Sequence, residues 1–314
     1  MSFTPYASAA PCSARCVFCS ETLLHKDSRL LSGSLRPGPR YHEELALALR
    51  ALEGLPLDYS LSGLESTDDP AWLLATLEVL EAHASRSEVG QQVLYTSAAG
   101  LADEGAGPRL IDALARFGLS RLEISRHAVE AAANQSIMRF NEGVAVATQG
   151  RFERTVRRVA GALPTRLVCV VQVGGVATLD EARRYLGWAR SLGVDQVVFR
   201  ELARTGADYP DSPALALLEG RRVELTELLP RERDGDFQLL AETEGYYWRS
   251  RTYRFDGGAV WVSFEDSDYA LMKERHHSSV VHKLVFHANG RLCADWDPER
   301  EVLLDLRDVA APDR

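Results

Sequence analysis

Three cysteines lie within eight residues near the start of the sequence, at Cys12, Cys16 and Cys19. Three thiolates at this spacing can hold three corners of a cubane iron–sulfur cluster. Because this run contains no fourth cysteine, the fourth iron would stay open to a substrate or a cofactor, as chemistry requires and electron transfer alone does not. The spacing therefore predicts a catalytic [4Fe-4S] cluster.

A zinc site is the main alternative for these cysteines. Structural zinc prefers four closed protein ligands, usually two Cys or His pairs. His276, His277 and His282 are distant in the sequence but could complete such a set. This interpretation predicts a zinc-binding protein without catalysis, and the colour of the purified protein distinguishes it from a cluster protein.

Apolar strand patterns and helical patterns alternate up to residue 202. The segments that we expect to be strands are 2–9, 57–63, 91–98, 120–126, 165–173 and 194–202. The segments that we expect to be helices are 42–55, 70–84, 108–118, 152–163 and 178–193. Strands separated by helices and short connections form a parallel sheet with right-handed crossovers. Six such strands predict an α/β fold, either a partial barrel or an open doubly wound sheet.

The pattern changes after residue 203. A turn-rich segment over 204–213 reads as a linker, and a helix is predicted over 215–229. Alternating segments separated by Asp-Gly-Gly and Asn-Gly turns then predict antiparallel hairpins. These segments are 246–255, 259–266, 280–287 and 291–297. We therefore expect two domains, 1–203 and 204–314, the second being an α+β extension that selects the substrate.

The C-x3-C-x2-C spacing, with Phe18 directly before the last cysteine, resembles the motif of the radical S-adenosylmethionine (radical SAM) enzymes. By the order of strands and helices, the resemblance covers about residues 1–202. It implies a partial (βα)6 TIM-like barrel with one [4Fe-4S] cluster on Cys12, Cys16 and Cys19. It also implies that the open iron binds the amino and carboxylate groups of SAM. One electron then cleaves SAM to a 5′-deoxyadenosyl radical, which abstracts a substrate hydrogen.

The segment Ser62-Gly63-Leu64-Glu65-Ser66 ends the second predicted strand and looks like the family segment Ser-Gly-Gly-Glu-Pro, which holds the SAM ammonium. Gly63 and Glu65 match, whereas Leu64 and Ser66 depart from the pattern and could change the backbone there. An acidic side chain and exposed carbonyls at the C-terminal end of a strand can receive an ammonium. The alternative for Glu65 is a solvated loop carboxylate.

Further polar residues end the other predicted strands, where the resemblance implies contacts with SAM. They are Thr96, Ser125, Arg126, Gln172 and Arg200, and Phe18 of the cysteine motif joins this cofactor-binding set. The resemblance implies a ribose contact for Ser125, main-chain adenine contacts at Gln172, and a carboxylate contact for Arg126. Arg200 would meet SAM or a substrate anion. The alternatives are helix caps at Ser125 or Arg126 and an ion pair across the barrel mouth at Arg200.

Cys293 is the only cysteine after residue 202, so we expect no auxiliary cluster in the extension. With no second cluster to accept an electron, a redox-neutral or elimination outcome is favoured. Cys293 could donate a hydrogen atom to a substrate radical, because S–H bonds are weak. The alternative is a packed cysteine, which is also our interpretation of Cys169. The pair His276 and His277 is a candidate for a substrate contact.

The composition excludes several classes of protein. With 314 residues, 46% hydrophobic and 26% charged, the chain is an ordinary folded protein and not a disordered one. A net charge of −9 argues against a nucleic-acid partner. The absence of a long apolar run and of a signal sequence predicts a cytoplasmic protein without a membrane segment. The odd count of five cysteines fits a reducing compartment.

The expected partners follow from these assignments. The substrate is a small biosynthetic molecule or, as the rival interpretation, a peptide that the enzyme epimerises or crosslinks. The resemblance also implies an electron donor such as flavodoxin or ferredoxin.

Overall fold

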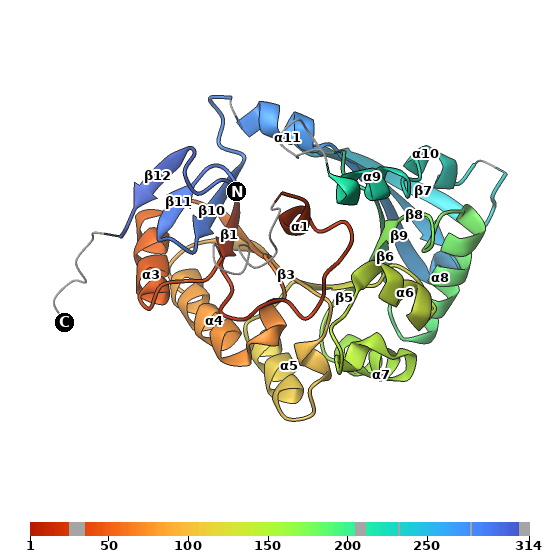
Figure 1. The fold of residues 1–314 in the computed structure, drawn as a ribbon, viewed down its shortest axis with the longest axis horizontal. Coiled ribbons are helices and arrows are strands. Elements are labelled where there is room, and N and C mark those ends of the chain that lie inside the picture. The colour runs from red at the N-terminus through yellow and green to blue at the C-terminus, as the bar shows by residue number, and fades with distance from the viewer. Residues whose placement is uncertain (25–34, 205–211, 232, 277, 308–314) are drawn as a thin grey trace. The chain divides into compact units, whose positions relative to one another are not determined.

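The computed structural model describes residues 1–24, 35–204, 212–231, 233–276 and 278–307 (Figure 1). Within the described part of residues 1–204, strands and helices alternate as predicted. The strands are β1 (Ser2–Tyr6), β2 (Leu57–Leu61), β3 (Val89–Thr96), β4 (Arg121–Ser125), β5 (Thr165–Val171) and β6 (Gln196–Glu201). The helices are α1 (Ser20–Leu24), α3 (Tyr41–Ala51), α4 (Pro70–Ala84), α5 (Ala106–Arg116), α6 (Ala131–Met138), α7 (Gln149–Ala160) and α8 (Leu179–Ser191). The predicted α/β fold is confirmed.

The described residues after 204 form a mixture of helices and strands. The helices are α9 (Pro213–Glu219), α10 (Leu225–Leu228) and α11 (Tyr269–His276). The strands are β7 (Phe237–Glu244), β8 (Trp248–Phe255), β9 (Val260–Ser267), β10 (Lys283–His287), β11 (Arg291–Cys293) and β12 (Val302–Asp305). The predicted hairpins are present, because β8 pairs antiparallel with β9 and β10 pairs antiparallel with β11.

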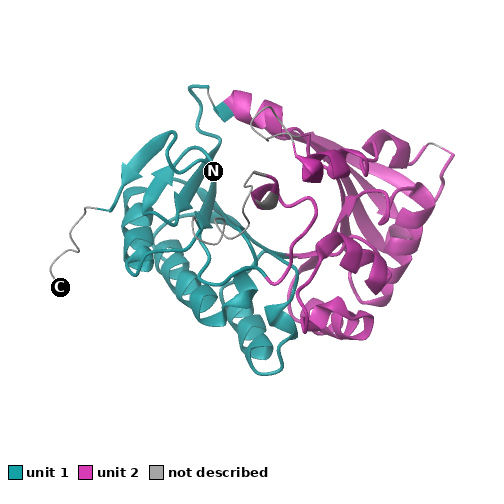
Figure 2. Cartoon of the chain, viewed as in Figure 1, with its two compact units in different colours: residues 1–12, 27–122, 276–314 teal, residues 13–26, 123–275 magenta. Residues whose placement is uncertain are grey.

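The chain divides into two compact units that alternate along the sequence (Figure 2). Unit 1 contains residues 1–12, 27–122 and 276–314, and unit 2 contains residues 13–26 and 123–275. In unit 1 the strand order is β12-β11-β10-β1-β2-β3, and in unit 2 it is β5-β6-β9-β8-β7. The functional boundary expected at residue 203 stays a prediction, because these units reflect packing and not a division of tasks.

Strands from the end of the chain extend the sheet of each unit. In unit 1, β10 pairs in parallel with β1, with Ser2 opposite Lys283 and Tyr6 opposite His287. In unit 2, β9 pairs in parallel with β6. The ring of Phe264 on β9 stacks on Phe199 of β6 with the ring centroids 5.4 Å apart. The residues after 204 therefore complete the cores that the earlier strands begin.

Local sequence explains where several elements begin. The Asp69 side chain accepts a hydrogen bond from the Trp72 N–H and caps α4, whose first residue Pro70 has no N–H to lose. Thr178 and Glu181 form a capping box at the start of α8. The β5 sequence is buried along most of its length, as expected of a parallel strand covered on both faces. These signals fix the strand–helix order.

The structure of the residues after 204 differs from the prediction in several details. The single helix predicted over 215–229 is interrupted, because α9 ends at Glu219 before Gly220 and α10 begins only at Leu225. The strand predicted over 291–297 ends at Cys293, where Asp295 and Asp297 accept hydrogen bonds from backbone N–H groups in turns. The exposed strands β7 and β12 were not predicted. Most of the linker predicted over 204–213 lies outside the described residues.

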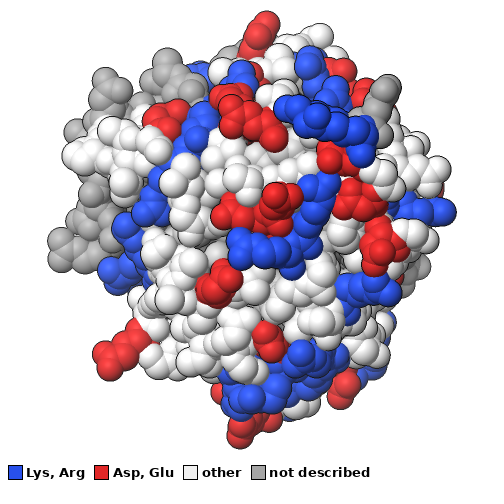
Figure 3. All heavy atoms as spheres, turned by 90° about the vertical axis from the view of Figure 1, so that its right-hand side faces the viewer, with Lys and Arg blue, Asp and Glu red and all other residues white. Residues whose placement is uncertain are grey.

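Charged side chains of both signs are interspersed on the face that Figure 3 shows. In unit 2, the partly buried Arg183 forms ion pairs with Asp180, Asp234 and Asp236. Among the described helices, none has the length and apolar character needed to cross a bilayer.

Candidate functional site

The cysteine loop is held by its backbone against the end of α6. In unit 2, the Arg15 N–H donates to the carbonyl oxygen of Met138 at 3.0 Å, and the Val17 N–H donates to that of Ile137 at 3.0 Å. The Cys19 N–H donates to the Cys16 carbonyl at 3.1 Å, which closes a tight turn before α1. These main-chain hydrogen bonds hold the loop against the end of α6.

The predicted ligands Cys12, Cys16 and Cys19 are half-buried, whereas Cys169 and Cys293 are buried. Among the described residues, no three His, Cys, Asp or Glu side chains gather closely enough to hold a single metal ion. A cubane takes each thiolate on a different iron, so its ligands stand further apart than those of a single zinc ion. The donor set of three partly exposed thiols on one loop fits a cluster, and the described residues do not assemble the closed zinc site.

Phe18 of the motif packs its ring against the imidazole of His127, with the centroids 4.8 Å apart and the planes nearly perpendicular. His127 is the second residue after β4 and is buried. The Val170 N–H donates to Nδ1 of His127 at 2.9 Å, so the proton of the neutral ring lies on Nε2. Burial, and next the charge of Arg126, lower the pKa of His127 to about 3, so the ring stays neutral.

Nε2 of His127 is buried and has no hydrogen-bond partner among the described residues. The same is true of Oε1 of Gln172, a wholly buried residue directly after β5. Nε2 of Gln172 lies 3.5 Å from the carbonyl oxygen of Val170, so both side chains are held by the same residue. One unused donor and one unused acceptor match an adenine edge, which offers an amino donor and ring-nitrogen acceptors. The sequence analysis predicted Gln172 as a site residue but did not predict His127.

The Gly63–Leu64 turn has a conformation that ordinarily favours glycine. Gly63 has φ +108°, and a Cβ there would lie 2.7 Å from the Tyr6 ring, so no other residue fits without movement. Leu64 has φ +53°, also in the left-handed region. The backbone therefore reaches the left-handed geometry at position 64 without the second glycine of the family pattern.

Glu65 is buried, which excludes the solvated-loop alternative. Its Oε1 accepts hydrogen bonds from the Thr67 N–H (3.2 Å), the Thr67 hydroxyl (2.6 Å) and the Thr96 hydroxyl (2.6 Å). Its Oε2 accepts one from the Ser97 N–H at 2.5 Å. A carboxylate oxygen has two lone pairs, so Oε2 keeps capacity for a further donor. Thr96, expected to face SAM, instead supports Glu65.

Arg126 is buried, and its side chain packs against residues of α7 and α8. Its guanidinium stacks over the rings of Phe152 and Trp188, 4.6 and 5.8 Å from their centroids. Nε donates to the Ala128 carbonyl and Nη2 to the Val129 carbonyl and Gln149 Oε1. Burial lowers its pKa to about 10. These contacts do not cap α6, and Nη1 is buried with no hydrogen-bond partner among the described residues, so the carboxylate contact of Arg126 stays a prediction.

Arg200 forms the ion pair that the sequence offered as its second interpretation. Its Nε and Nη2 lie 3.1 and 2.7 Å from Oε2 of Glu265, which faces it across the β6–β9 pair. Partial burial raises the pKa of the nearby Tyr247, and the charges of Arg200 and Glu265 act on that pKa in opposite directions. Ser125 ends β4 half-buried, and Ser62 is half-buried beside Gly63, so both positions agree with the predicted strand ends.

The candidate residues predicted after residue 203 are Cys293 and the pair His276 and His277. Sγ of Cys293 lies 3.7 Å from the Pro298 carbonyl, and burial raises the pKa of this thiol to about 12. This environment is that of a packed cysteine, and its role as a hydrogen donor stays a prediction. His276 is buried at the end of α11, and its neighbour His277 lies outside the described residues.

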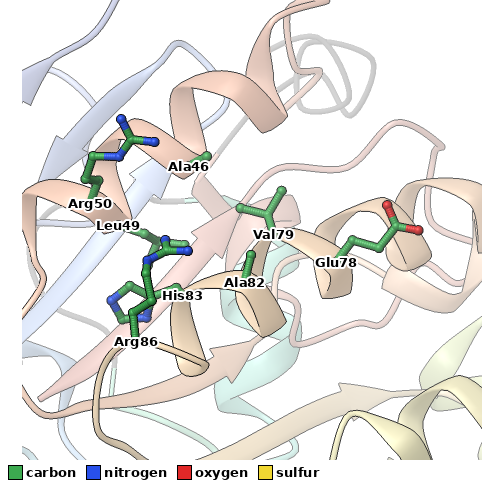
Figure 4. A pocket seen from close by; sticks show the side chains of 8 residues that line it. All are labelled: Ala46, Leu49, Arg50, Glu78, Val79, Ala82, His83 and Arg86. Atoms are coloured by element: carbon green, nitrogen blue, oxygen red, sulfur yellow. The ribbon is translucent and has the colours of Figure 1, made fainter.

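A cavity of about 220 Å³ lies between α3 and α4, away from the strand ends (Figure 4). Arg50 and Glu78 project at its opposite ends, and apolar side chains such as Leu49 and Val79 form its wall. Apart from Arg86, its lining residues come from α3 and α4, and none is a predicted site residue. It therefore adds nothing to the cysteine site.

No protein-family model matches the sequence, and no curated protein matches it. The structure is similar to that of SuiB from Streptococcus suis, a radical SAM enzyme, in its crystal form bound to S-adenosylmethionine. The TM-score is 0.54 at 11% identity, covering 94% of this chain and 60% of SuiB. The structure of SuiB with its precursor peptide SuiA gives a TM-score of 0.51 at 11% identity, covering 98% and 64%.

The chain thus spans about 60% of the length of the SuiB chain that it matches. The similarity covers 94% of this chain and so extends beyond residues 1–204. The chain therefore has the fold of the radical SAM enzymes, a partial TIM-like α/β barrel.

Proposed function

We propose that this chain is a radical SAM enzyme with one [4Fe-4S] cluster bound by Cys12, Cys16 and Cys19. The observation that carries the proposal is the C-x3-C-x2-C loop, fixed by main-chain hydrogen bonds to α6, in a chain with this fold. When bound, the cluster would supply the electron that cleaves SAM to the hydrogen-abstracting 5′-deoxyadenosyl radical. Residues 1–203 would carry this chemistry and residues 204–314 would select the substrate.

The chain's own residues bind and orient SAM in this proposal. Oε2 of Glu65 would accept a hydrogen bond from the SAM ammonium, next to the left-handed turn at Gly63 and Leu64. His127 Nε2–H and Gln172 Oε1 would pair with the adenine edge, because both are buried polar atoms without a partner. Leaving such atoms unpaired costs free energy, which a ligand recovers.

The substrate that we propose is a small biosynthetic molecule with a redox-neutral or elimination outcome. Cys293 is the only cysteine after residue 202, so an auxiliary cluster to accept a second electron is not expected. The reducing electron would come from a donor such as flavodoxin or ferredoxin in the cytoplasm.

The proposal is tested by iron, sulfide and SAM cleavage in anaerobically purified protein. We expect a brown protein with iron and sulfide that forms 5′-deoxyadenosine from SAM and a reductant. Alanine at Cys12, Cys16 or Cys19 should abolish iron binding, whereas Cys169→Ser and Cys293→Ser should retain it. A colourless wild type containing zinc would favour the non-catalytic zinc alternative, and a single-cysteine variant with full iron would refute the ligand assignment.

A peptide substrate is the second candidate, and two observations favour it. SuiB, which shares this fold, has been crystallised with its precursor peptide SuiA. The strand β7 is exposed along nearly its whole length and lies at the end of the unit 2 strand order. Such an edge can receive an extended peptide as an added strand. A short peptide encoded beside the gene, labelled and titrated with the protein, would test this candidate by fluorescence anisotropy.

A further inference from the structure

Lys283 is a buried amine without a counter-charge. It begins β10, and only 7% of the residue is exposed. Its Nζ lies 3.4 Å from the centroid of the Trp296 ring, and among the described residues no carboxylate forms an ion pair with it. Burying an unpaired ammonium is unfavourable, and a cation–π contact offsets only part of that cost. The protein therefore carries this lysine at the expense of stability.

The surroundings of Lys283 connect it to the glycine turn of the candidate SAM site. The Trp296 ring packs edge-on against Tyr6, with centroids 5.0 Å apart. Tyr6 in turn lies against Gly63, and Leu64 packs on the same cluster. The aromatic pair Tyr6 and Trp296 therefore forms a wall with Lys283 at one end and the 63–64 turn at the other, all within unit 1.

A second polar group without a partner lies on the same strand face as this wall. Thr4 and Tyr6 share one face of β1, because alternate residues of a strand point the same way. Thr4 is opposite Val285, which is two residues after Lys283 on β10. The Thr4 hydroxyl is fully buried and unpartnered among the described residues. A buried amine and a buried hydroxyl on neighbouring strands point to a ligand.

The charged groups near Lys283 do not neutralise it. The carboxylates of Asp295 and Asp297, on either side of Trp296, accept hydrogen bonds from the backbone N–H groups of 297 and 299. Nε2 of His287, on the same face of β10, lies 3.1 Å from the carbonyl oxygen of Asp295. Burial alone lowers the pKa of Lys283 to about 7. The amine therefore exchanges its proton near neutrality.

The choice of lysine is itself informative in this chain. Of 36 basic residues only three are lysines, at positions 26, 273 and 283. An arginine at 283 could not lose its proton, whereas a desolvated lysine becomes a nucleophile.

We propose that Lys283 forms an imine with a carbonyl-bearing small molecule, an aldehyde or an oxo acid, with Thr4 donating a hydrogen bond to the carbonyl oxygen. The neutral amine attacks the carbonyl carbon, a C–N bond forms, and the oxygen leaves as water after proton transfer, with no net oxidation or reduction. That this molecule is the substrate rests on the proposed function, since it would be held beside the 63–64 turn.

The test is reductive trapping with glyoxylate and sodium cyanoborohydride at pH 7, on the purified full-length protein, followed by peptide mass spectrometry. We expect the adduct at Lys283 to form at least tenfold faster than at Lys273, the half-buried internal control on α11. Thr4→Val should slow the labelling of Lys283 severalfold. Labelling of Lys283 no faster than that of Lys273 would overturn the proposal.

Two variants keep this test independent of folding and of the cluster. Lys283→Arg keeps the charge and should show no adduct at position 283, while Lys283→Met should raise the midpoint of thermal unfolding because an unpaired amine is removed. Trapping requires neither iron nor SAM. Fast labelling in a protein that never cleaves SAM would therefore refute the proposed function and leave the Lys283 chemistry standing.

Discussion

Burying a polar atom costs free energy unless the atom forms a hydrogen bond. The candidate site residues include buried atoms with hydrogen-bond partners and buried atoms without them. The Glu65 carboxylate is paired, with four donors from Thr67, Thr96 and Ser97. His127 and Gln172 instead present buried atoms without a partner among the described residues. The first arrangement fixes the position of a charge, and the second leaves hydrogen-bonding capacity for a ligand.

The first residue-level prediction concerns Glu65→Gln. The amide would replace one acceptor oxygen by a donor that faces other donors, and it would remove the charge offered to the SAM ammonium. We expect SAM affinity to fall by about 1–3 kcal/mol, with iron content unchanged. Calorimetric titration with SAM measures this loss. Glu81→Gln, at an exposed position of α4, is the matched control, and equal affinity in both variants would remove Glu65 from the SAM site.

The second residue-level prediction concerns how His127 makes the stability of the protein depend on pH. Its pKa is lowered to about 3 in the folded protein, against about 6.5 when unfolded, so only the unfolded chain binds the proton between these values. Stability should therefore fall as the pH drops from 6.5 towards 3, by up to about 1.4 kcal/mol per pH unit from this residue. His127→Gln should flatten this slope in denaturant titrations of the protein without cluster. Between pH 7.5 and 8.5, where the ring is neutral in both states, the two proteins should differ by a constant amount.

At the scale of elements, the strand–helix order could be predicted because periodicity, caps and turns are local. The end of α4 at Ala84 and the capping box of α8 follow from residues within a few positions of each other. The parallel pairings of β10 with β1 and β9 with β6 could not be predicted, because nothing local marks a partner so far away in the sequence. The exposed strand β7 was missed since its residues lack a buried face.

The cysteine spacing and the strand ends predict Cys12, Cys16, Cys19 and Glu65 as site residues, because motifs are local, and these assignments stay predictions. His127 was not predicted as a candidate site residue, because its candidacy depends on a contact between strands. The Val170 N–H, which lies on β5, fixes the tautomer of the His127 ring. A buried histidine two residues after a strand was the available signal.

An element-level prediction follows for a fragment of residues 1–203. This fragment lacks β10 and β9, so Tyr41 loses its contact with Phe286 and Phe199 loses its contact with Phe264. Exposed apolar rings and two open strand edges favour aggregation. We expect the fragment to lack a cooperative unfolding transition, measured by circular dichroism and size-exclusion chromatography, whereas residues 1–307 should keep it. A monomeric fragment that melts cooperatively would contradict this prediction.

At the scale of the whole molecule, the chemistry depends on what the chain offers to a substrate radical. The extension contributes a single cysteine, Cys293, whose thiol lies against the Pro298 carbonyl. Under the proposed function, a substrate radical would then gain a hydrogen atom or lose a leaving group, unless it returned its electron to the proposed cluster.

We therefore predict that product formation needs no stoichiometric oxidant. With deuterium at the abstracted position of the substrate, label should appear in 5′-deoxyadenosine, and the product should keep the oxidation level of the substrate or be its elimination product. Mass spectrometry of both products checks this. A product oxidised by two electrons, with no leaving group lost, would contradict it, and a fully active Cys293→Ala enzyme would remove Cys293 as the hydrogen donor.

The pairing of β1 with β10 also has a consequence for the timing of synthesis. A ribosome makes Ser2–Tyr6 almost a full chain length before it makes Lys283–His287, so the first strand waits for its neighbour while the rest of the barrel emerges. Contacts of such long sequence separation form slowly. Until then Phe3 and Tyr6 lack their later neighbours, and the cysteine loop follows an unfinished strand. The pairing of β1 with β10 should therefore be among the last steps of folding.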